Sequence, residues 1–146
     1  MKSTQKITRV QLKLNQENEI FLLGIVSAEP DYKLSLSINK KFRISLKNIF
    51  PIKITAGTGS ETVFSRFSDL SGSPGIIYIL ISNRSGKYFL HKKLKNVDYV
   101  FLVHNSENDS DLDRISSTMR EIEFVNAVFI IDIKSLKDKN LQYLMR

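Results

Sequence analysis

Basic side chains gather in the middle of the chain. The chain has 146 residues and a formal net charge of +7, and residues 32–97 hold 12 Lys and Arg against only Glu61 and Asp69, so this segment is +10 and the remainder −3. Such cations neutralise phosphates, and an exposed aromatic ring among them stacks on a base, which predicts binding to RNA or another polyanion. The other interpretations are attraction to an anionic membrane or an acidic protein, or solubility alone. The candidate residues are Lys40, Lys41, Arg43, Lys47 and Lys53 in a first run and Arg84, Lys87, Lys92, Lys93 and Lys95 in a second, which Tyr88 and Phe89 interrupt.

No motif for catalysis stands out in the sequence. Gly57-Thr58-Gly59-Ser60 is glycine-rich but lacks the Lys-Ser/Thr pair of a phosphate-binding loop. Ser71-Gly72-Ser73-Pro74-Gly75 has its glycines in the wrong register for a nucleophile elbow. A triad assembled from distant residues leaves no local motif, so a hydrolase is not excluded. We therefore expect a non-catalytic protein, with an enzyme acting on an anionic small molecule as the least supported alternative.

His91 and His104 are the only histidines, and the chain has no cysteine. This excludes disulfides, thiolate catalysis and cysteine-ligated metal sites, so we expect no metal or cofactor. We assign His91, which precedes Lys92 and Lys93, to the basic surface. His104 ends an apolar strand, where we favour a hydrogen bond to nearby backbone; in a parallel sheet it would face a ligand crevice instead.

An acidic stretch, Asp109-Ser110-Asp111-Leu112-Asp113, has the alternating acids of a calcium loop. Arg114 stands where that loop requires glycine, and Arg120 where it requires the closing glutamate. Side-chain acceptors and negative charge at this place also suit the start of a helix. We predict a capping role for these acids.

The stretch from Asn96 to His104 predicts the central strand of a sheet. Tyr99, Phe101 and Val103 alternate with Val100 and Leu102, and both sets are apolar, as in a strand covered on both faces. The elements expected after it are a helix over 112–122, a strand over 125–133 and a short helix over 135–145.

The amino-terminal half predicts one helix among strands. The segment from Ser27 to Phe42 is ambiguous, because Leu34 and Ile38 fit both the alternation of a strand and the spacing of a helix. Pro30, with Ser27 or Asp31 as a cap, favours the helix. The expected elements are a hairpin over 7–14 and 21–26, a helix over 31–42, a weakly alternating stretch over 44–55, an edge strand over 62–69, and a hairpin over 76–81 and 87–90.

Length and composition predict a single globular domain over residues 1–146. A hydrophobic fraction of 42% with 5 Tyr and 9 Phe supports a packed core without a metal or disulfide. The expected fold class is α+β, a mixed α/β domain with a mostly antiparallel sheet, about three helices and a carboxy-terminal strand-helix-strand-helix order. No apolar stretch reaches transmembrane length. Glu17 and Glu19 directly before the apolar segment 20–28 argue against a signal peptide, so we expect a cytoplasmic protein.

Short fragments spread over most of the chain match a family signature in part. They are Val97-Asp98-Tyr99 after Leu94-Lys95-Asn96, the strand Leu23-Gly24-Ile25, Asp31-Tyr32-Lys33-Leu34 with Asn39, and Leu80-Ile81-Ser82-Asn83. Together they resemble the IPExxxVDY family of uncharacterised bacterial proteins from the Bacteroidetes, although His91-Lys92-Lys93 occupies the Ile-Pro-Glu positions. The resemblance implies a helix at Asp31 to Phe42 and a cytoplasmic home, and it carries no assigned activity.

The leading hypothesis is a non-catalytic binding or adaptor protein whose basic middle segment contacts RNA or an RNA-containing assembly. The rival is a protein–protein interaction or scaffold module that uses exposed apolar surface or the edge strand 62–69. It predicts salt-tolerant association with one protein partner. The oligomeric state, and whether the two basic runs share one face, stay open.

Overall fold

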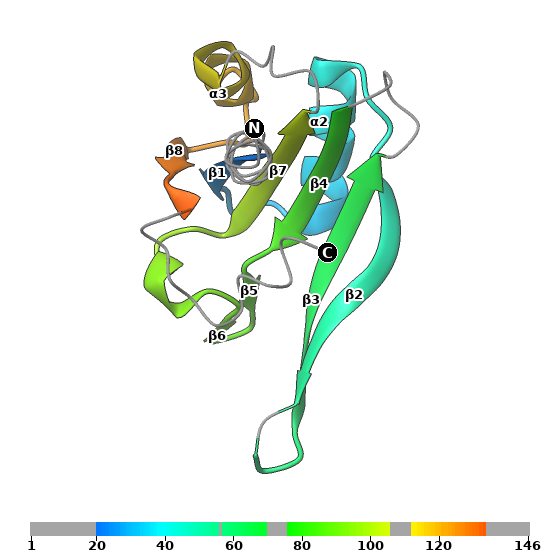
Figure 1. Cartoon of the computed structure of the whole chain (residues 1–146), viewed down its shortest axis with the longest axis vertical. Coiled ribbons are helices and arrows are strands. Elements are labelled where there is room, and N and C mark those ends of the chain that lie inside the picture. The colour runs from blue at the N-terminus through cyan, green and yellow to red at the C-terminus, as the bar shows by residue number, and fades with distance from the viewer. Residues whose placement is uncertain (1–19, 56, 70–75, 106–111, 134–146) are drawn as a thin grey trace, which may run out of the picture.

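A computed structural model gives the fold and describes residues 20–55, 57–69, 76–105 and 112–133 (Figure 1). Six strands form one antiparallel sheet in the order β2-β3-β4-β7-β1-β8, and two short strands form a separate hairpin. The elements are β1 (Ile20–Val26), α2 (Asp31–Phe42), β2 (Lys47–Thr55), β3 (Glu61–Asp69), β4 (Ile76–Ser82), β5 (Arg84–Ser85), β6 (Tyr88–Phe89), the 3-10 helix η1 (Lys92–Leu94), β7 (Tyr99–Asn105), α3 (Leu112–Arg120) and β8 (Ala127–Ile131).

The predicted central strand is confirmed. β7 lies between β4 and β1 and is antiparallel to both. Its Phe101 and Val103 belong to one hydrophobic cluster, whereas Val100 and Leu102 belong to a second cluster on the opposite face. The unbroken apolar run therefore reflects a strand that is covered on both faces.

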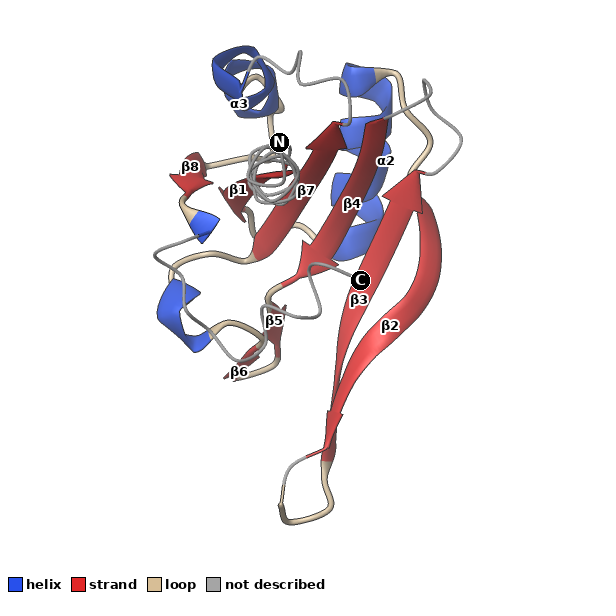
Figure 2. Ribbon diagram, in the orientation of Figure 1, coloured by secondary structure: helices blue, strands red, loops and turns tan. Residues whose placement is uncertain are grey.

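Both α-helices contribute to the same hydrophobic cluster. Leu34 and Ile38 of α2 and Ile115 and Met119 of α3 pack in the cluster that contains Phe101, and Figure 2 shows α2 running along the far side of β4 and β7. α2 confirms the helix prediction for 31–42, and α3 confirms the prediction for 112–122 except for its last two residues. The third expected helix, 135–145, and the capping acids 109–111 lie outside the described residues. None of the described helices has the length and apolarity needed to cross a membrane.

The start of α2 differs from the prediction. Pro30 occupies the N-cap position in an extended conformation, and no side chain caps the helix. Neither predicted cap is available, because Ser27 Oγ donates to the carbonyl of Phe124 and Asp31 Oδ1 accepts from the backbone N–H of Tyr32. Proline fits here because its ring fixes φ near the value that the extended cap needs.

The predicted edge strand at 62–69 is a strand but not an edge. β3 lies between β2 and β4, so β2 forms this edge of the described sheet. β2 is difficult to predict from the sequence, because Pro51 interrupts the alternation of apolar and polar residues. The structure accommodates that proline at a bulge between Ile49 and Ile52, a position where a missing N–H is tolerated.

Two predicted hairpins are paired differently. β4 has β3 and β7 as its neighbours, so residues 87–90 do not pair with it; β5 and β6 instead pair with each other around Gly86, whose φ of 60° suits glycine. β1, the second strand of the predicted amino-terminal hairpin, has β7 on one side and β8 on the other. The first strand of that hairpin, 7–14, lies outside the described residues.

β2 and β3 extend beyond the neighbouring strands as a long hairpin (Figure 1). β4 pairs with β3 only over Arg66 to Asp69, so β2 is the one described strand that pairs with residues 61–65. We call residues 50–55 and 61–65 the arm. It carries Lys53 of the first basic run away from the helices.

Candidate polyanion-binding surface

The second basic run lies on one excursion from the sheet. Residues 83–98, which we call the basic loop, connect β4 to β7 and contain β5, β6 and η1. The loop leaves the sheet at Ser82 and returns at Tyr99, and these two residues are paired across the strands. Its cations have no acidic neighbour in sequence until Asp98. The fold thus concentrates five positive side chains, Arg84, Lys87, Lys92, Lys93 and Lys95, at one end of the sheet.

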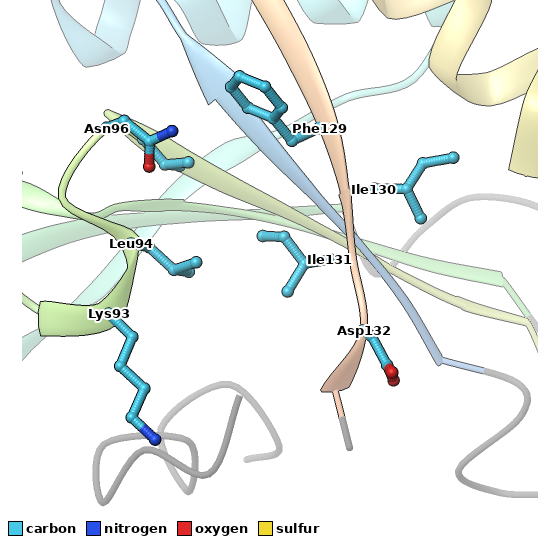
Figure 3. Close-up of a pocket in the computed structure, with 8 residues that line it drawn as sticks. Lys93, Leu94, Asn96, Phe129, Ile130, Ile131 and Asp132 are labelled. Carbon is cyan, nitrogen blue, oxygen red and sulfur yellow. The ribbon is translucent and has the colours of Figure 1, made fainter. Parts of the chain in front are cut away.

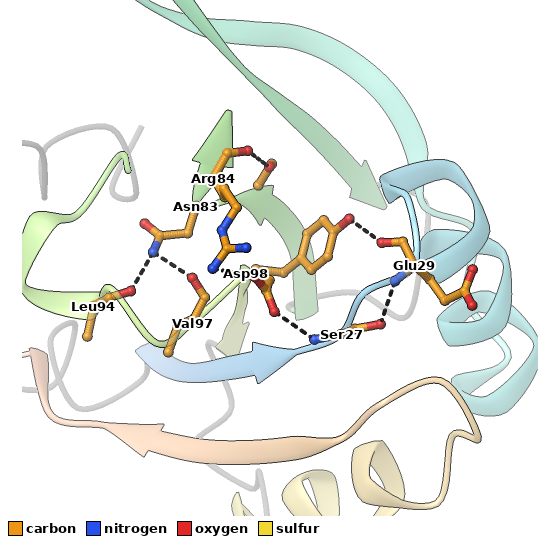
Figure 4. A network of polar contacts seen from close by, with 9 residues as sticks. Ser27, Glu29, Asn83, Arg84, Leu94, Val97 and Asp98 are labelled. Carbon is orange, nitrogen blue, oxygen red and sulfur yellow. Dashed lines mark hydrogen bonds and ion pairs between the residues drawn. The ribbon is translucent and has the colours of Figure 1, made fainter. Parts of the chain in front are cut away.

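Asn83 holds the basic loop in shape (Figure 4). Its side chain is fully buried, and the amide Nδ2 donates to the carbonyls of Leu94 at 2.8 Å and Val97 at 2.9 Å. Its Oδ1 accepts from the backbone N–H of His91 at 2.9 Å. Three points along the loop are therefore fixed by one side chain, which limits the conformational freedom of the lysines between them.

Asp98 fastens the end of the loop to the connection between β1 and α2. Its Oδ2 accepts from the backbone N–H of Ser27 at 2.9 Å, and its Oδ1 pairs with Arg84 Nη2 at 3.2 Å (Figure 4). The next residue, Tyr99, donates its hydroxyl to the carbonyl of Glu29 at 2.6 Å. Burial, reinforced by the charges of Asp31, Asp98 and Glu29, raises the pKa of Tyr99 to about 12, so this hydroxyl stays protonated at neutral pH.

Val97 completes the junction by filling the space left by a glycine. A Cβ on Gly24 of β1 would lie 2.8 Å from Val97 Cγ2, closer than real contacts allow. Val97 itself is 2% exposed. Each residue of the Val97-Asp98-Tyr99 signature thus has a contact within the protein. Val97 packs against Gly24, Asp98 bonds to the backbone of Ser27, and Tyr99 bonds to the backbone of Glu29. These three residues therefore have a structural role: they hold the basic loop against β1 and the connection that follows it.

The lysines of the basic loop face solvent. Lys87, Lys92 and Lys95 are exposed and form no ion pair with any described residue. Tyr88 is 54% exposed, and Lys87 Nζ lies 5.7 Å from the centre of its ring. Arg84 differs from these three lysines, because it is paired with Asp98 and lies over Phe89. The loop therefore presents unpaired positive charge next to one accessible aromatic ring.

The first basic run is divided between two places. Lys40, Lys41 and Arg43 lie at the end of α2, and Lys47 begins β2, whereas Lys53 lies on the arm. Figure 1 shows the end of α2 and the basic loop at opposite ends of the sheet. Lys41 is also partly neutralised, since its Nζ lies 3.4 Å from Glu121 of the segment after α3. The two runs therefore do not form one continuous surface, with Lys53 as the member that extends toward the loop.

A polar hollow of about 610 Å³ opens beside the start of α2. Arg84, Asp98 and Tyr99 line it, together with Asn96 and Asn126. Arg84 and Asp98 are paired with each other, and the hydroxyl of Tyr99 donates to the carbonyl of Glu29, so each of these three groups already has a partner. The hollow supports a structural junction better than a site for acid–base chemistry.

A second hollow, of about 320 Å³, lies between the basic loop and β8. Leu94 and Ile131 point toward each other across it, and Lys93 and Asp132 lie at its margin (Figure 3). The neighbouring Phe129 is 43% exposed. This hollow is apolar in its centre and is bordered by β8, which forms the second edge of the described sheet.

His91 does not occupy the predicted position. His91 is fully buried, so its assignment to the basic surface is wrong; Asn83 draws its backbone inward. His104 is half-buried and pairs with Ile77 of β4 and Ile20 of β1 in an antiparallel sheet, which has no crevice of the parallel type. It lines neither of the two hollows. Within the described residues, no group of three or more His, Cys, Asp or Glu could hold a metal ion.

No protein-family model matches the chain, and no curated protein is significantly similar to it.

Two residues matter here that sequence reasoning passed over. Asn83 looked like one polar residue of a turn, because its partners lie 8 to 14 residues away. Phe50 is 86% exposed on β2, and the only signal for it is the Pro51 that follows and breaks the alternation. Both depend on tertiary pairing that local patterns do not contain.

Proposed function

We propose that this protein is a non-catalytic cytoplasmic binding or adaptor protein whose basic loop contacts RNA or an RNA-containing assembly. The observation that carries the proposal is the exposed, unpaired charge of Lys87, Lys92 and Lys95 on a loop that Asn83 and Asp98 hold in place. The partial match to the IPExxxVDY signature belongs to the same proposal and adds no activity to it.

A fixed basic loop suits a polyanion for two physical reasons. Binding releases counterions from the phosphates, which favours association in proportion to the number of cations in contact. A loop that is already ordered also loses less conformational freedom on binding than a flexible tail would. Tyr88, half-exposed beside Lys87, adds an aromatic face on which a base can stack.

Charge reversal at η1 tests the proposal. In a variant with Lys92→Glu, Lys93→Glu and Lys95→Glu, affinity for labelled single-stranded RNA falls, and the slope of log K against log salt becomes shallower by about 2, at roughly 0.7 for each lost phosphate contact. The matched control reverses Lys40, Lys41 and Arg43 at the far end of the sheet. We expect a smaller change there, because these cations lie away from the loop and Lys41 already has an acidic partner.

The measurement is fluorescence anisotropy over a salt series, with circular dichroism to show that each variant is folded. If the η1 variant binds RNA and heparin as tightly as the wild type, the basic loop is not the binding site. If wild-type protein binds neither ligand at low salt, the lysines only keep the protein soluble.

A protein–protein interaction module is the second candidate. It is supported by the exposed Phe129 and Ile130 on β8, next to the apolar hollow that includes Leu94. An extended segment of a partner could pair with this edge and place an apolar side chain in the hollow. Such a complex would resist salt, whereas a complex with RNA would not, so the same salt series separates the two candidates.

A further inference from the structure

Phe50 is the most exposed large hydrophobic side chain described. It is 86% exposed, whereas Ile52, two residues later, is 4% exposed and packs in the core. β2 advances three residues from Ile49 to Ile52 while β3 advances two, from Arg66 to Phe64. This bulge keeps Ile49 and Ile52 in register with the same face of β3 and leaves Phe50 out of the core. The ring is therefore presented at the edge of the sheet.

Three cations lie near Phe50 on β2 and β3. Arg66 Nε donates to the carbonyl of Phe50 at 3.1 Å, which places a guanidinium beside the bulge. Lys47 and Lys53, both exposed, lie three residues to either side along β2. Neither lysine forms an ion pair with a described residue. An aromatic face flanked by positive charge matches a base flanked by phosphates.

The bulge lies on the same side of the molecule as the basic loop. Arg66 of β3 is paired with Ile81 of β4, one residue before the strand ends and the loop begins. β3 also contacts β5 of the loop. Ile49 and Ile81 are thus separated by two strand spacings, about 10 Å in all. A short single strand of nucleic acid can cross that span.

We propose that Phe50 stacks on an unpaired base of a single-stranded nucleic acid whose backbone runs over the arm and the basic loop. The proposal rests on the proposed function and narrows it, because a base can stack on Phe50 only where it is not already stacked within a duplex. Arg66, Lys53 and the loop lysines supply the phosphate contacts. The ligand class is single-stranded RNA rather than a polyanion in general.

The chain contains no tryptophan, so Phe50→Trp introduces a single fluorescent reporter. We expect a single-stranded oligouridylate to quench this fluorescence and heparin to leave it unchanged. In a second variant, Phe50→Ala, affinity for the oligonucleotide falls roughly 5- to 150-fold, the range for losing one base–aromatic stack, while heparin affinity is retained. Tyr32→Ala is the control, since Tyr32 is also exposed, at 62%, but lies on α2 and not on the arm.

The outcomes separate this inference from the function on which it rests. One outcome is that the charge reversal at η1 weakens RNA binding, while Phe50→Ala binds RNA as tightly as Tyr32→Ala does and the fluorescence of Phe50→Trp does not change. In that case Phe50 is not a stacking residue and the basic loop is still the site. If Phe50→Ala changes the sedimentation coefficient instead of RNA affinity, the ring is a contact between copies of the chain and the inference is overturned. If wild-type protein binds no RNA, both proposals fail.

Discussion

At the residue scale, Asn83 fixes three points of the basic loop with one buried side-chain amide. Replacing it by alanine leaves the carbonyl of Val97 and the N–H of His91 without their partner, whereas the carbonyl of Leu94 keeps the hydrogen bond that it accepts from the N–H of Val97. Unpaired buried groups of this kind cost about 1–3 kcal/mol each, and the loop relaxes in part to satisfy them. Asn83→Ala should therefore lower the free energy of unfolding by about 3 kcal/mol, as measured by urea denaturation.

Asn96→Ala provides the matched control, because Asn96 lies in the same loop and is exposed. Its effect should stay within about 0.5 kcal/mol. A loss of less than about 1 kcal/mol in Asn83→Ala would mean that the loop holds its shape without this amide. The role of Asn83 was not predictable from its neighbours in sequence, since a polar residue after a strand reads as part of a turn. Only the fold reveals that it is buried.

At the scale of the element, the end of α2 stores backbone strain. Arg43 is the C-cap residue and has φ 56° and ψ 48°, the left-handed region in which side chains with a Cβ are disfavoured. Its backbone N–H donates to the carbonyl of Asn39, so the conformation is required to close the helix. Arg43→Gly should raise the free energy of unfolding by about 1 kcal/mol relative to Arg43→Ala, because glycine adopts this conformation without strain.

Thermal or urea unfolding of the two Arg43 variants checks this expectation, and Lys40→Gly is the control. The same change inside the last turn of α2 should destabilise by about 1 kcal/mol, since glycine is a poor helix former where φ is negative. Equal stability of Arg43→Gly and Arg43→Ala would show that the helix end relaxes in solution.

The elements themselves were largely predictable, because a period of four in α2 and α3 and an unbroken apolar run in β7 are local signals. Which strands lie side by side was not. The strand β3 has the composition of an edge strand. It is nevertheless an inner strand, because β2 pairs alongside it and accommodates Pro51 at a bulge. The same limit applies to the surface: the charges of each basic run were evident, but their separation depends on where α2 crosses the sheet.

At the scale of the whole molecule, stability is expected to be uneven. β7 is flanked on both sides and covered on both faces, whereas residues 61–65 of the arm pair with a single described strand, β2. Amides of β7 should exchange with deuterium only through global unfolding, and those of the arm about tenfold or more faster. Native-state hydrogen exchange followed by mass spectrometry distinguishes them. Equal protection along β2, β3 and β7 would mean that the arm is as cooperative as the core.

The basic loop leaves and re-enters the sheet at one paired position, Ser82 and Tyr99. Its length therefore does not affect the register of β4 and β7, and a longer loop costs only the slowly growing entropy of closure. In evolutionary terms, the exposed positions among residues 84–95 are where this sequence can change or lengthen with little cost to the fold, provided that Asn83, Val97, Asp98 and the buried Leu90 and His91 persist. Related chains that bind different ligands should therefore differ mainly at these positions.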